Sequence, residues 1–390
     1  MKILQVIHAF VPAWDYGGSL RVCYEVSKEL VKRGHDVTVY TTDTLNSKER
    51  VKEREEVIEG IKVTRFRNLS NDIAYNHHLF ISPGMIISLR NNLKYFDIIH
   101  LHEYRTIHNV AVHRYARKLD IPYILQAHGA IPRVAAKQRL KHVYDAIWGN
   151  KLLRDASNVI ALTEMETEQY RSMGVSEDKI KIVPNGIDPL EFGNLPSGEE
   201  FRKQYGLNEN DKITLYLGRI HQTKGLDLLA KAFAHLTKEL DNAKLVIVGP
   251  DDGYRHELTG LAQSLGISNK IIFTGPVYGT DRLGAYVSAS VFVTPSFLGF
   301  PVTFVEACAC GTPIITTDKN DRLDWIHNQV GYMVSYDEDE LKNAMMRVLN
   351  SRDLARQFGE NGRSLVRERF NWSKIADELE QIYLEAKVIH

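Results

Sequence analysis

Two cationic side chains lie close together in the stretch GRIHQTKG, residues 218–225. Arg219 and Lys224 directly follow an apolar run, 213–218, and precede a segment of helical length. A guanidinium and an ammonium at a strand end can neutralise a diphosphate and the charge that develops when a bond to it breaks. Because exposed Arg and Lys are commonly plain surface residues, the pair alone is a moderate indication of an anion site.

Two glycines precede the first predicted helix, in the stretch YGGSLR at 16–21. Gly17 and Gly18 would allow a phosphate group to approach the backbone N–H groups at the positive end of that helix. The chain has no GxGxxG fingerprint, and a plain turn would account for the same residues.

A histidine follows another predicted strand, in the stretch QAHGAIP at 126–132. His128 could form a hydrogen bond with a substrate hydroxyl group, although a structural histidine is the commoner outcome. His100 and His102 share one face of a strand, but no cysteine or acid completes a metal set. The acidic run 337–339 suits a helix start, so we expect neither a metal site nor a cofactor.

A single acid interrupts the apolar stretch PSFLGFPVTFVEACACG, residues 295–311. We expect Glu306 near a helix start, where one carboxylate can accept hydrogen bonds from two ribose hydroxyls; a buried or capping glutamate is the alternative. Backbone N–H groups of Gly299, Phe300 and Val302 could face a ligand, whereas Pro301 has none.

Runs rich in Val and Ile alternate with helix-length segments along all 390 residues. Runs of this kind that barely alternate are typical of parallel strands covered on both faces. The pattern predicts two doubly wound α/β domains with ligands at the carboxyl ends of the strands and a default site in the cleft between the domains. We place the domains at 1–188 and 189–371, with a final amphipathic helix in 372–390.

Composition narrows the class of protein further. Lys+Arg and Asp+Glu both total 49, and this zero net charge argues against a dedicated nucleic-acid binder. Three cysteines fit a reducing cytosol, and no apolar run reaches membrane-spanning length, so we expect a cytoplasmic protein.

The motifs occur in an order that resembles the retaining glycosyltransferases of family 4, which have the two-domain GT-B fold and include bacterial and archaeal enzymes of polysaccharide and glycolipid synthesis. The resemblance covers nearly the whole chain. It rests on the glycines before Arg21, HG at 128–129, PNGID at 184–188, GR…KG at 218–225, FTG at 273–275, and PS…GF…E with ACGTP at 295–313.

The resemblance implies transfer of a hexosyl group from a UDP- or GDP-sugar to a hydroxyl of a glycan or lipid-linked acceptor, without a metal ion. It implies that the last helix crosses back to the first domain. The implied roles are diphosphate binding by Arg219 and Lys224, ribose binding by Glu306, phosphate contact by Gly17 and Gly18, contact of His128 with the donor sugar, and base contact by the backbone at Val277.

One position departs from the family pattern. Leu298 stands where the family has the first acid of its Glu-x7-Glu motif, which contacts a donor-sugar hydroxyl. We therefore expect the backbone of 299–302 to carry more of the sugar recognition.

The segment 132–154 combines basic and aromatic side chains. Such a helix could lie on an anionic membrane and meet a lipid-linked acceptor, making the protein peripheral at the inner membrane face, or it could be a solvated basic surface. Its tentative acceptor or membrane residues are Arg133, Lys137, Arg139 and Lys141.

Other activities occur on the same architecture. A nucleotide-sugar 2-epimerase would need acid/base carboxylates at the site, and a glycan phosphorylase would need a pyridoxal-phosphate lysine. A non-catalytic nucleotide-sugar binder is supported only by the missing first acid.

Overall fold

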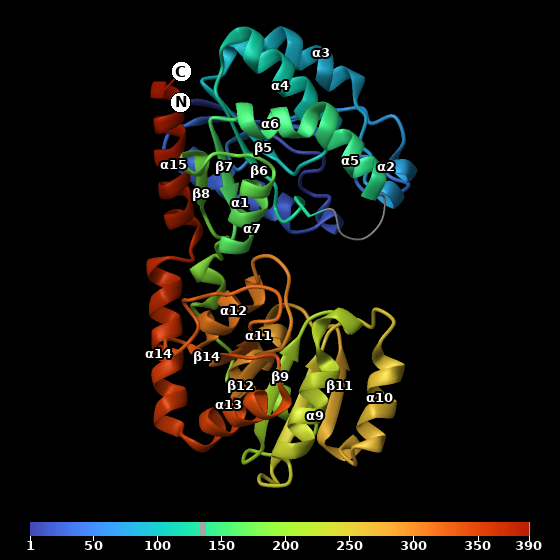
Figure 1. The fold of residues 1–390 in the computed structure, drawn as a ribbon, viewed down its shortest axis with the longest axis vertical. Helices are drawn as coiled ribbons and strands as arrows, with labels where there is room; N and C mark the ends of the chain where they lie inside the picture. Colours follow the sequence, from blue (N-terminus) through green and yellow to red (C-terminus); the bar gives the residue numbers. More distant parts are fainter. Residues whose placement is uncertain (133–137, 390) are drawn as a thin grey trace. The chain divides into compact units, whose positions relative to one another are not determined.

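The computed structural model describes residues 1–132 and 138–389 (Figure 1). The described chain forms two compact units, which are described separately here. Unit 1 comprises residues 1–185 and 372–390, and unit 2 comprises residues 186–371.

Unit 1 is built on one eight-stranded sheet in the order β3-β4-β2-β1-β5-β6-β7-β8, in which only β3 is antiparallel to its neighbour, β4. Its strands are β1 (Lys2–Val6), β2 (Asp36–Thr42), β3 (Glu55–Ile58), β4 (Ile61–Phe66), β5 (Ile98–His102), β6 (Tyr123–Gln126), β7 (Asn158–Ala161) and β8 (Ile180–Ile182).

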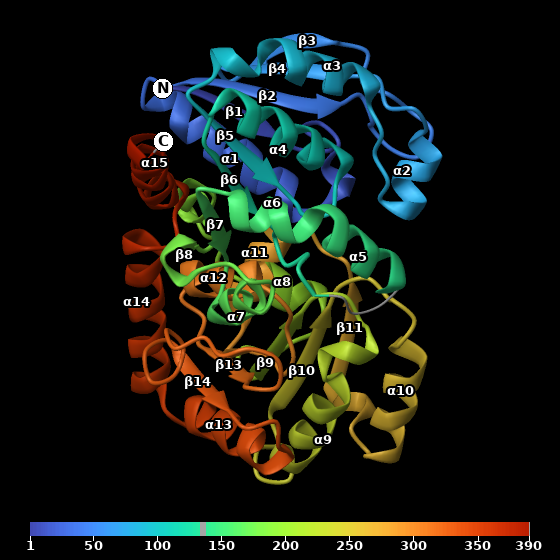
Figure 2. The same ribbon diagram turned by 45° about the horizontal axis from the view of Figure 1, so that its top comes forward.

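Helices cover both faces of this sheet. They are α1 (Gly18–Lys32), α2 (Asn71–His77), α3 (Pro83–Asn92), α4 (Ile107–Leu119), α5 (Gln138–Tyr144), the π-helical turn η3 (Asp145–Gly149), α6 (Asn150–Asp155), α7 (Glu164–Ser172) and α15 (Trp372–Ile389). Successive strand residues point to opposite faces, so Ile3 packs in the core with α1 and α15 while Leu4 packs with α3, α4 and α6 (Figure 2).

The helix α15 belongs to unit 1, as the resemblance implied. Ile375, Leu379 and Ile382, the predicted apolar face, are buried against the first core. Arg33 forms an ion pair with Asp377, and His35 Nε2 lies 2.8 Å from Glu380 Oε1. Residues distant in sequence therefore close one face of the sheet.

Unit 2 contains a six-stranded parallel sheet in the order β11-β10-β9-β12-β13-β14. Its strands are β9 (Lys212–Leu217), β10 (Ala243–Val248), β11 (Ile271–Gly275), β12 (Val291–Thr294), β13 (Ile314–Thr317) and β14 (Gly331–Val334). Its helices are α8 (Glu199–Gln204), α9 (Leu226–Leu236), α10 (Arg255–Ser264), α11 (Gly279–Ser288), α12 (Val302–Cys310), α13 (Glu338–Asn350) and α14 (Arg352–Glu368).

The two parallel sheets confirm the predicted fold class. In each unit the parallel strands end at one common edge, and the loops that follow them carry most of the residues singled out above.

Candidate active site

The loop after β9 carries the two predicted cations of unit 2. A Cβ atom built on Gly249 would lie 1.9 Å from the carbonyl oxygen of Gly218, so the backbones at the ends of β9 and β10 pack directly together. This close approach fixes the start of the loop. Arg219 then extends into solvent with 65% of its side chain exposed, and its Nη1 donates to Asp252 Oδ2 at 2.6 Å.

Lys224 ends the short 3-10 turn η6 (Gln222–Lys224) and is half-buried. Burial, and then repulsion from Arg219, lowers the pKa of its ammonium group. Within the described residues, Lys224 Nζ has no carboxylate partner. A partly desolvated ammonium beside a second cation favours an incoming anion.

The turn of Lys224 packs against the loop that follows β12. Gly225 has φ +69°, and a Cβ atom there would lie 3.0 Å from Pro295 Cβ, so this position favours glycine. Ser296 Oγ donates to the carbonyl oxygen of Thr223 at 2.8 Å. These contacts bring the cationic loop and the predicted ligand-facing loop together.

Glu306 does not lie at a helix start, which corrects the expectation from the sequence. The helix begins at Val302, and Glu306 is the fifth of its nine residues, buried in its middle. Its Oε1 accepts from Arg282, and its Oε2 accepts from the Tyr286 hydroxyl at 3.0 Å. A carboxylate offers about four lone pairs, so both oxygens keep capacity for ligand hydroxyls.

The loop before Glu306 presents open backbone and one apolar side chain. In the described structure the N–H groups of Gly299, Phe300 and Val302 donate no hydrogen bond, and Pro301 has none to donate. Leu298, which replaces the family acid, is 69% exposed. This position therefore presents an apolar side chain, whereas the acid of the family pattern would accept a hydrogen bond from a sugar hydroxyl.

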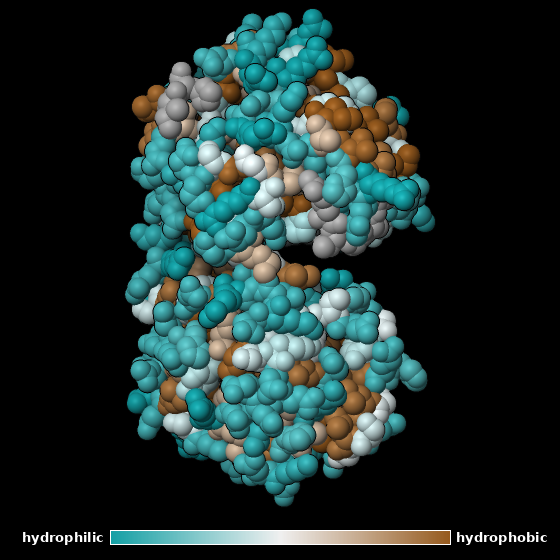
Figure 3. Space-filling model, in the orientation of Figure 1, coloured by the Kyte–Doolittle hydropathy of each residue, from teal (hydrophilic) through white to brown (hydrophobic). Residues whose placement is uncertain are grey.

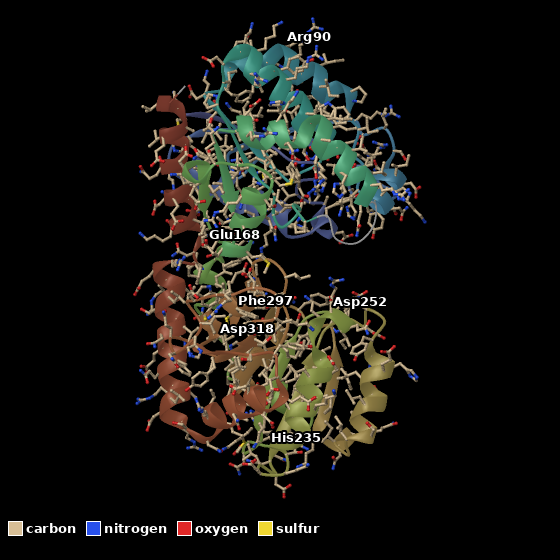
Figure 4. The ribbon with its side chains drawn as sticks, in the orientation of Figure 1. Arg90, Glu168, His235, Asp252, Phe297 and Asp318 are labelled. Atoms are coloured by element: carbon tan, nitrogen blue, oxygen red, sulfur yellow. The ribbon has the colours of Figure 1, made fainter. Side chains whose placement is uncertain are left out.

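Val277 follows β11 at the same edge of the sheet and is half-buried against the core of unit 2. Figure 4 labels Asp252 and Phe297 at this edge, and His235 at the opposite edge of unit 2. The loops after β9, β11 and β12, with the helix α12, thus bring the cations, Val277, the open N–H groups and Glu306 to one edge of the unit 2 sheet.

In unit 1 the glycine loop precedes α1. Gly17 is the N-cap residue with φ +99°, and a Cβ atom on either Gly17 or Gly18 would meet nothing within 4 Å. One residue further on, Ser19 Oγ donates to Glu103 Oε1. The Gly17 N–H group donates to the Trp14 carbonyl oxygen at 3.2 Å, whereas the Gly18 N–H group donates no backbone hydrogen bond in the described structure.

His128 follows β6 in a left-handed backbone conformation, with φ +52°. Its Nε2 lies 2.9 Å from His102 Nδ1. Burial lowers the pKa of His128 to about 4, although Glu103 acts to raise it. The imidazole is therefore neutral at physiological pH, suited to hydrogen bonding rather than to charge compensation.

Sequence reasoning missed the residues that support this loop. Glu166 is buried and accepts from the N–H groups of Gly129 and Leu162, each at 2.8 Å. Arg105 donates to the carbonyl oxygens of Ala130 and Ile131, at 2.5 and 2.9 Å. Glu166 stands three residues after Thr163, the N-cap of α7, at the spacing of a capping box, which is a local signal for its role at the helix start. No local motif marks Arg105, whose carbonyl partners lie on another loop.

The predicted basic segment is described only in part. Arg133 and Lys137 lie outside the described residues. Arg139 is exposed and Lys141 is half-buried on α5, while Asp145 is buried and pairs with Arg105, with Nη2 2.8 Å from Oδ2. Hydrophobic side chains gather over α5 and η3 (Figure 3). The apolar residues, 44–67% exposed, are Leu140, Val143, Ile147 and Trp148.

Among the described residues, no group of three or more His, Cys, Asp or Glu side chains could hold a metal ion. No helix within the described ranges is long and apolar enough to span a membrane.

Comparison with known proteins identifies the family. Residues 16–190 match the family model described as Glycosyltransferase Family 4, and residues 197–365 match the one described as Glycosyl transferases group 1. An uncharacterized glycosyltransferase of Methanocaldococcus jannaschii is 29% identical over 98% of each chain.

Two further proteins are informative. A GDP-mannose-dependent alpha-(1-6)-phosphatidylinositol monomannoside mannosyltransferase of Mycobacterium tuberculosis is 30% identical over 58% of this chain and 61% of its own. The crystal structure of Anabaena HepE in complex with UDP and glucose superposes with a TM-score of 0.74 at 19% identity, covering 99% of this chain and 100% of that one. Together with the two parallel sheets, these matches show that the chain belongs to the family 4 glycosyltransferases and has their GT-B fold.

Proposed function

We propose that this glycosyltransferase moves a hexosyl group from a UDP- or GDP-sugar to a hydroxyl of a glycan or lipid-linked acceptor, with retention of anomeric configuration and without a metal ion. The observation that carries the proposal is Lys224, a half-buried ammonium without a carboxylate partner in the described structure, next to Arg219. Such a pair suits the diphosphate of a nucleotide sugar.

In the proposed reaction, the bond between the anomeric carbon and the diphosphate oxygen breaks, and the diphosphate leaves with the electron pair. Arg219 and Lys224 stabilise the charge that collects on it, supported by the glycine loop, in which Gly17 leaves room for the phosphate and the Gly18 N–H group donates to it. The acceptor hydroxyl oxygen bonds to the same face of the anomeric carbon. Its proton passes to the leaving phosphate oxygen, so no protein nucleophile is required.

Glu306 is proposed to accept hydrogen bonds from the two ribose hydroxyls, and the backbone at Val277 to contact the base. The mannosyltransferase relative is GDP-mannose-dependent and HepE binds UDP, so both nucleotides are candidates for this chain. His128 is proposed to contact the transferred sugar.

The test is transfer and hydrolysis on a panel of UDP- and GDP-sugars, preceded by thermal-shift screening, because a tightly bound donor stabilises the folded state. Lys224→Ala should lower kcat/KM by about 10²–10³, the loss typical of one positioned charge-stabilising group. The matched control is Lys238→Ala, an exposed lysine just beyond the far end of α9. Near-wild-type turnover by Lys224→Ala would contradict the mechanism, and donor epimerisation without transfer would contradict the reaction class.

A second proposal concerns the acceptor. The exposed apolar side chains of α5 and η3, flanked by Arg139 and Lys141, suit contact with an anionic membrane that carries a lipid-linked acceptor. The protein would then be cytoplasmic and peripheral at the inner membrane face.

Sedimentation with vesicles of anionic lipid should show binding that weakens at high salt. The double variant Leu140→Ser/Val143→Ser should abolish it, whereas Ile87→Ser, at a similarly exposed position on α3, should not. Absence of binding at both low and high salt would remove the membrane contact from the proposal.

A further inference from the structure

A chain of buried hydrogen bonds runs beneath His128. Tyr383 of α15 lies 3.5 Å from Gln5 Nε2, and Gln5 Oε1 lies 2.8 Å from His102 Nε2. His102 Nδ1 in turn lies 2.9 Å from His128 Nε2. Gln5, His102 and Tyr383 are each at most 2% exposed. The chain thus runs along the face of the sheet that α15 covers, and its buried members link α15 to the predicted sugar contact.

The order of protons along this chain follows from the amide of Gln5. Its Oε1 can only accept, so His102 Nε2 must carry a proton. Burial, and then repulsion from His100 and His128, keeps the pKa of His102 well below its usual value, so the ring is neutral and has one N–H. His102 Nδ1 is therefore an acceptor, and His128 Nε2 must be the donor to it.

This order leaves one free lone pair, on His128 Nδ1. That atom has no hydrogen-bond partner in the described structure. It is not fully buried either, so a ligand or solvent can reach it. The lone pair of Nδ1 can accept a hydrogen bond from a hydroxyl group. An ionised carboxylate has no hydrogen to donate, so it cannot form this hydrogen bond. Glu103, whose negative charge acts on His128, adds to the rejection of an anion.

We propose that Gln5 and His102 are positioning residues that hold His128 as a hydrogen-bond acceptor, and that the site thereby selects a neutral sugar hydroxyl over a uronate carboxylate. The inference rests on the proposed function, in which His128 contacts the transferred sugar. It adds to that function the tautomer of His128, the residues that set this tautomer, and the class of sugar that the site admits.

The first experiment needs no substrate. Nitrogen-15 NMR of the full chain labelled at histidine, with His128 assigned from the spectrum of His128→Asn, reports which ring nitrogen carries the proton. We expect protonation at Nε2 in the wild-type protein. Protonation at Nδ1 would overturn the proposal, because His128 would then present a donor.

The second experiment removes the acceptor that sets the order. Gln5→Leu leaves His102 Nε2–H without a partner, so the His102 proton should move to Nδ1 and drive the His128 proton outward to its own Nδ1. We expect kcat/KM for a neutral hexose donor to fall about tenfold, as for one lost hydrogen bond. Thr41→Val, which removes a buried hydroxyl without a partner on β2, should change it less than twofold. An unchanged His128 tautomer in Gln5→Leu would contradict the role of Gln5, and the wild-type spectrum decides the tautomer even if this variant does not fold.

The third experiment tests selectivity with donor pairs that differ only in a hydroxymethyl or a carboxylate group, UDP-glucose with UDP-glucuronate and GDP-mannose with GDP-mannuronate. The neutral member of the bound pair should be preferred, and preference for the uronate would overturn the specificity claim. Failure of every donor to bind or react would instead contradict the proposed function, while the tautomer measured by NMR would stand.

Discussion

The two units place different electrostatics on similar scaffolds. Both carry their candidate residues where parallel strands end, yet unit 2 offers Arg219 and Lys224, whereas unit 1 offers histidines that burial keeps neutral. In the described structure, five histidines have a lowered pKa, and all belong to unit 1: His8, His100, His102, His108 and His128. The cations at the strand edge of unit 2 therefore suit an anion, whereas the neutral histidines at the edge of unit 1 suit uncharged hydroxyl groups, as the proposed transfer from a diphosphate to a hydroxyl would require.

The largest expected effect is a loss of stability in acid, which should be greater for unit 1 because unit 1 contains the buried neutral histidines. Burial lowers the pKa of His108 and His128 to about 4 and that of His100 to about 3. In the unfolded chain they protonate near pH 6.5, so between about pH 6.5 and 4 the unfolded state binds more protons. The stability of unit 1 should therefore be fully present above pH 6.5 and fall by up to about 9 kcal/mol by pH 4.

Hydrogen exchange followed by peptide mass analysis measures the two units separately. Protection in β1, β5 and β6 should be lost at a higher pH than protection in β9 and β10. Parallel loss in both units would show that the buried histidines do not set the acid limit of unit 1.

The second prediction concerns the buried acid of unit 2. Glu306→Gln leaves the half-buried Arg282 guanidinium with the weaker of its two carboxylate partners in the described structure, Glu191, whose Oε2 lies 3.7 Å from Nη2. We expect a loss of about 2 kcal/mol in the free energy of unfolding by urea, below the usual cost for a fully buried pair because Arg282 is partly exposed. Donor affinity should fall as well.

The matched control is Glu338→Gln, which breaks the half-exposed pair with Lys231 and should cost less than about 1 kcal/mol. Equal losses for the two variants would show that the Glu306–Arg282 pair is as weakly coupled as a surface pair.

The third prediction uses the departure at Leu298. Because this side chain is exposed, Leu298→Glu should change stability by less than about 0.5 kcal/mol. The new carboxylate can accept from a sugar hydroxyl, so KM for a neutral hexose donor should fall by up to about tenfold. Donor KM should be measured in Leu298→Glu with and without Gln5→Leu, because the two substitutions affect the proposed sugar contacts of unit 2 and unit 1 separately. A restored acid that changes neither KM nor donor preference would place sugar recognition in unit 1 alone.

The smallest effect is expected at the glycine loop of unit 1. Gly18 begins α1 with open space around it, so Gly18→Ala should raise the free energy of unfolding by about 0.5 kcal/mol. If a phosphate approaches this backbone, the added methyl group should nevertheless weaken donor binding severalfold, measured by calorimetry. Unchanged binding would leave phosphate recognition to unit 2.

Much of the fold could be predicted from the sequence because buried parallel strands appear as runs of Val and Ile. The strands β3, β8 and β14 are harder to predict, because they are short and partly exposed, lie at sheet edges and lack this signal. The cations and glycines were predictable because each follows a strand in sequence.

The positions of polar groups relative to one another were harder to predict. Glu306 was expected at a helix start because its loop reads as apolar up to that point, whereas the helix begins four residues earlier. The contacts among Gln5, His102 and His128 depend on the register of β1, β5 and β6, which no local pattern specifies. Glu166 and Arg105 form hydrogen bonds with backbone atoms of the His128 loop. Every residue has these backbone atoms, so the sequence of the loop does not indicate its partners.

The return of α15 to unit 1 has a consequence for synthesis on the ribosome. Tyr383 and the apolar face of α15 complete a core whose other members are all translated before residue 186. Unit 2 is continuous in sequence, so it can reach its native state while unit 1 still waits for residues 372–389. We therefore expect unit 2 to complete its fold before unit 1, although unit 1 begins the chain, and in that interval the sheet of unit 1 would expose an apolar face that a chaperone could shield.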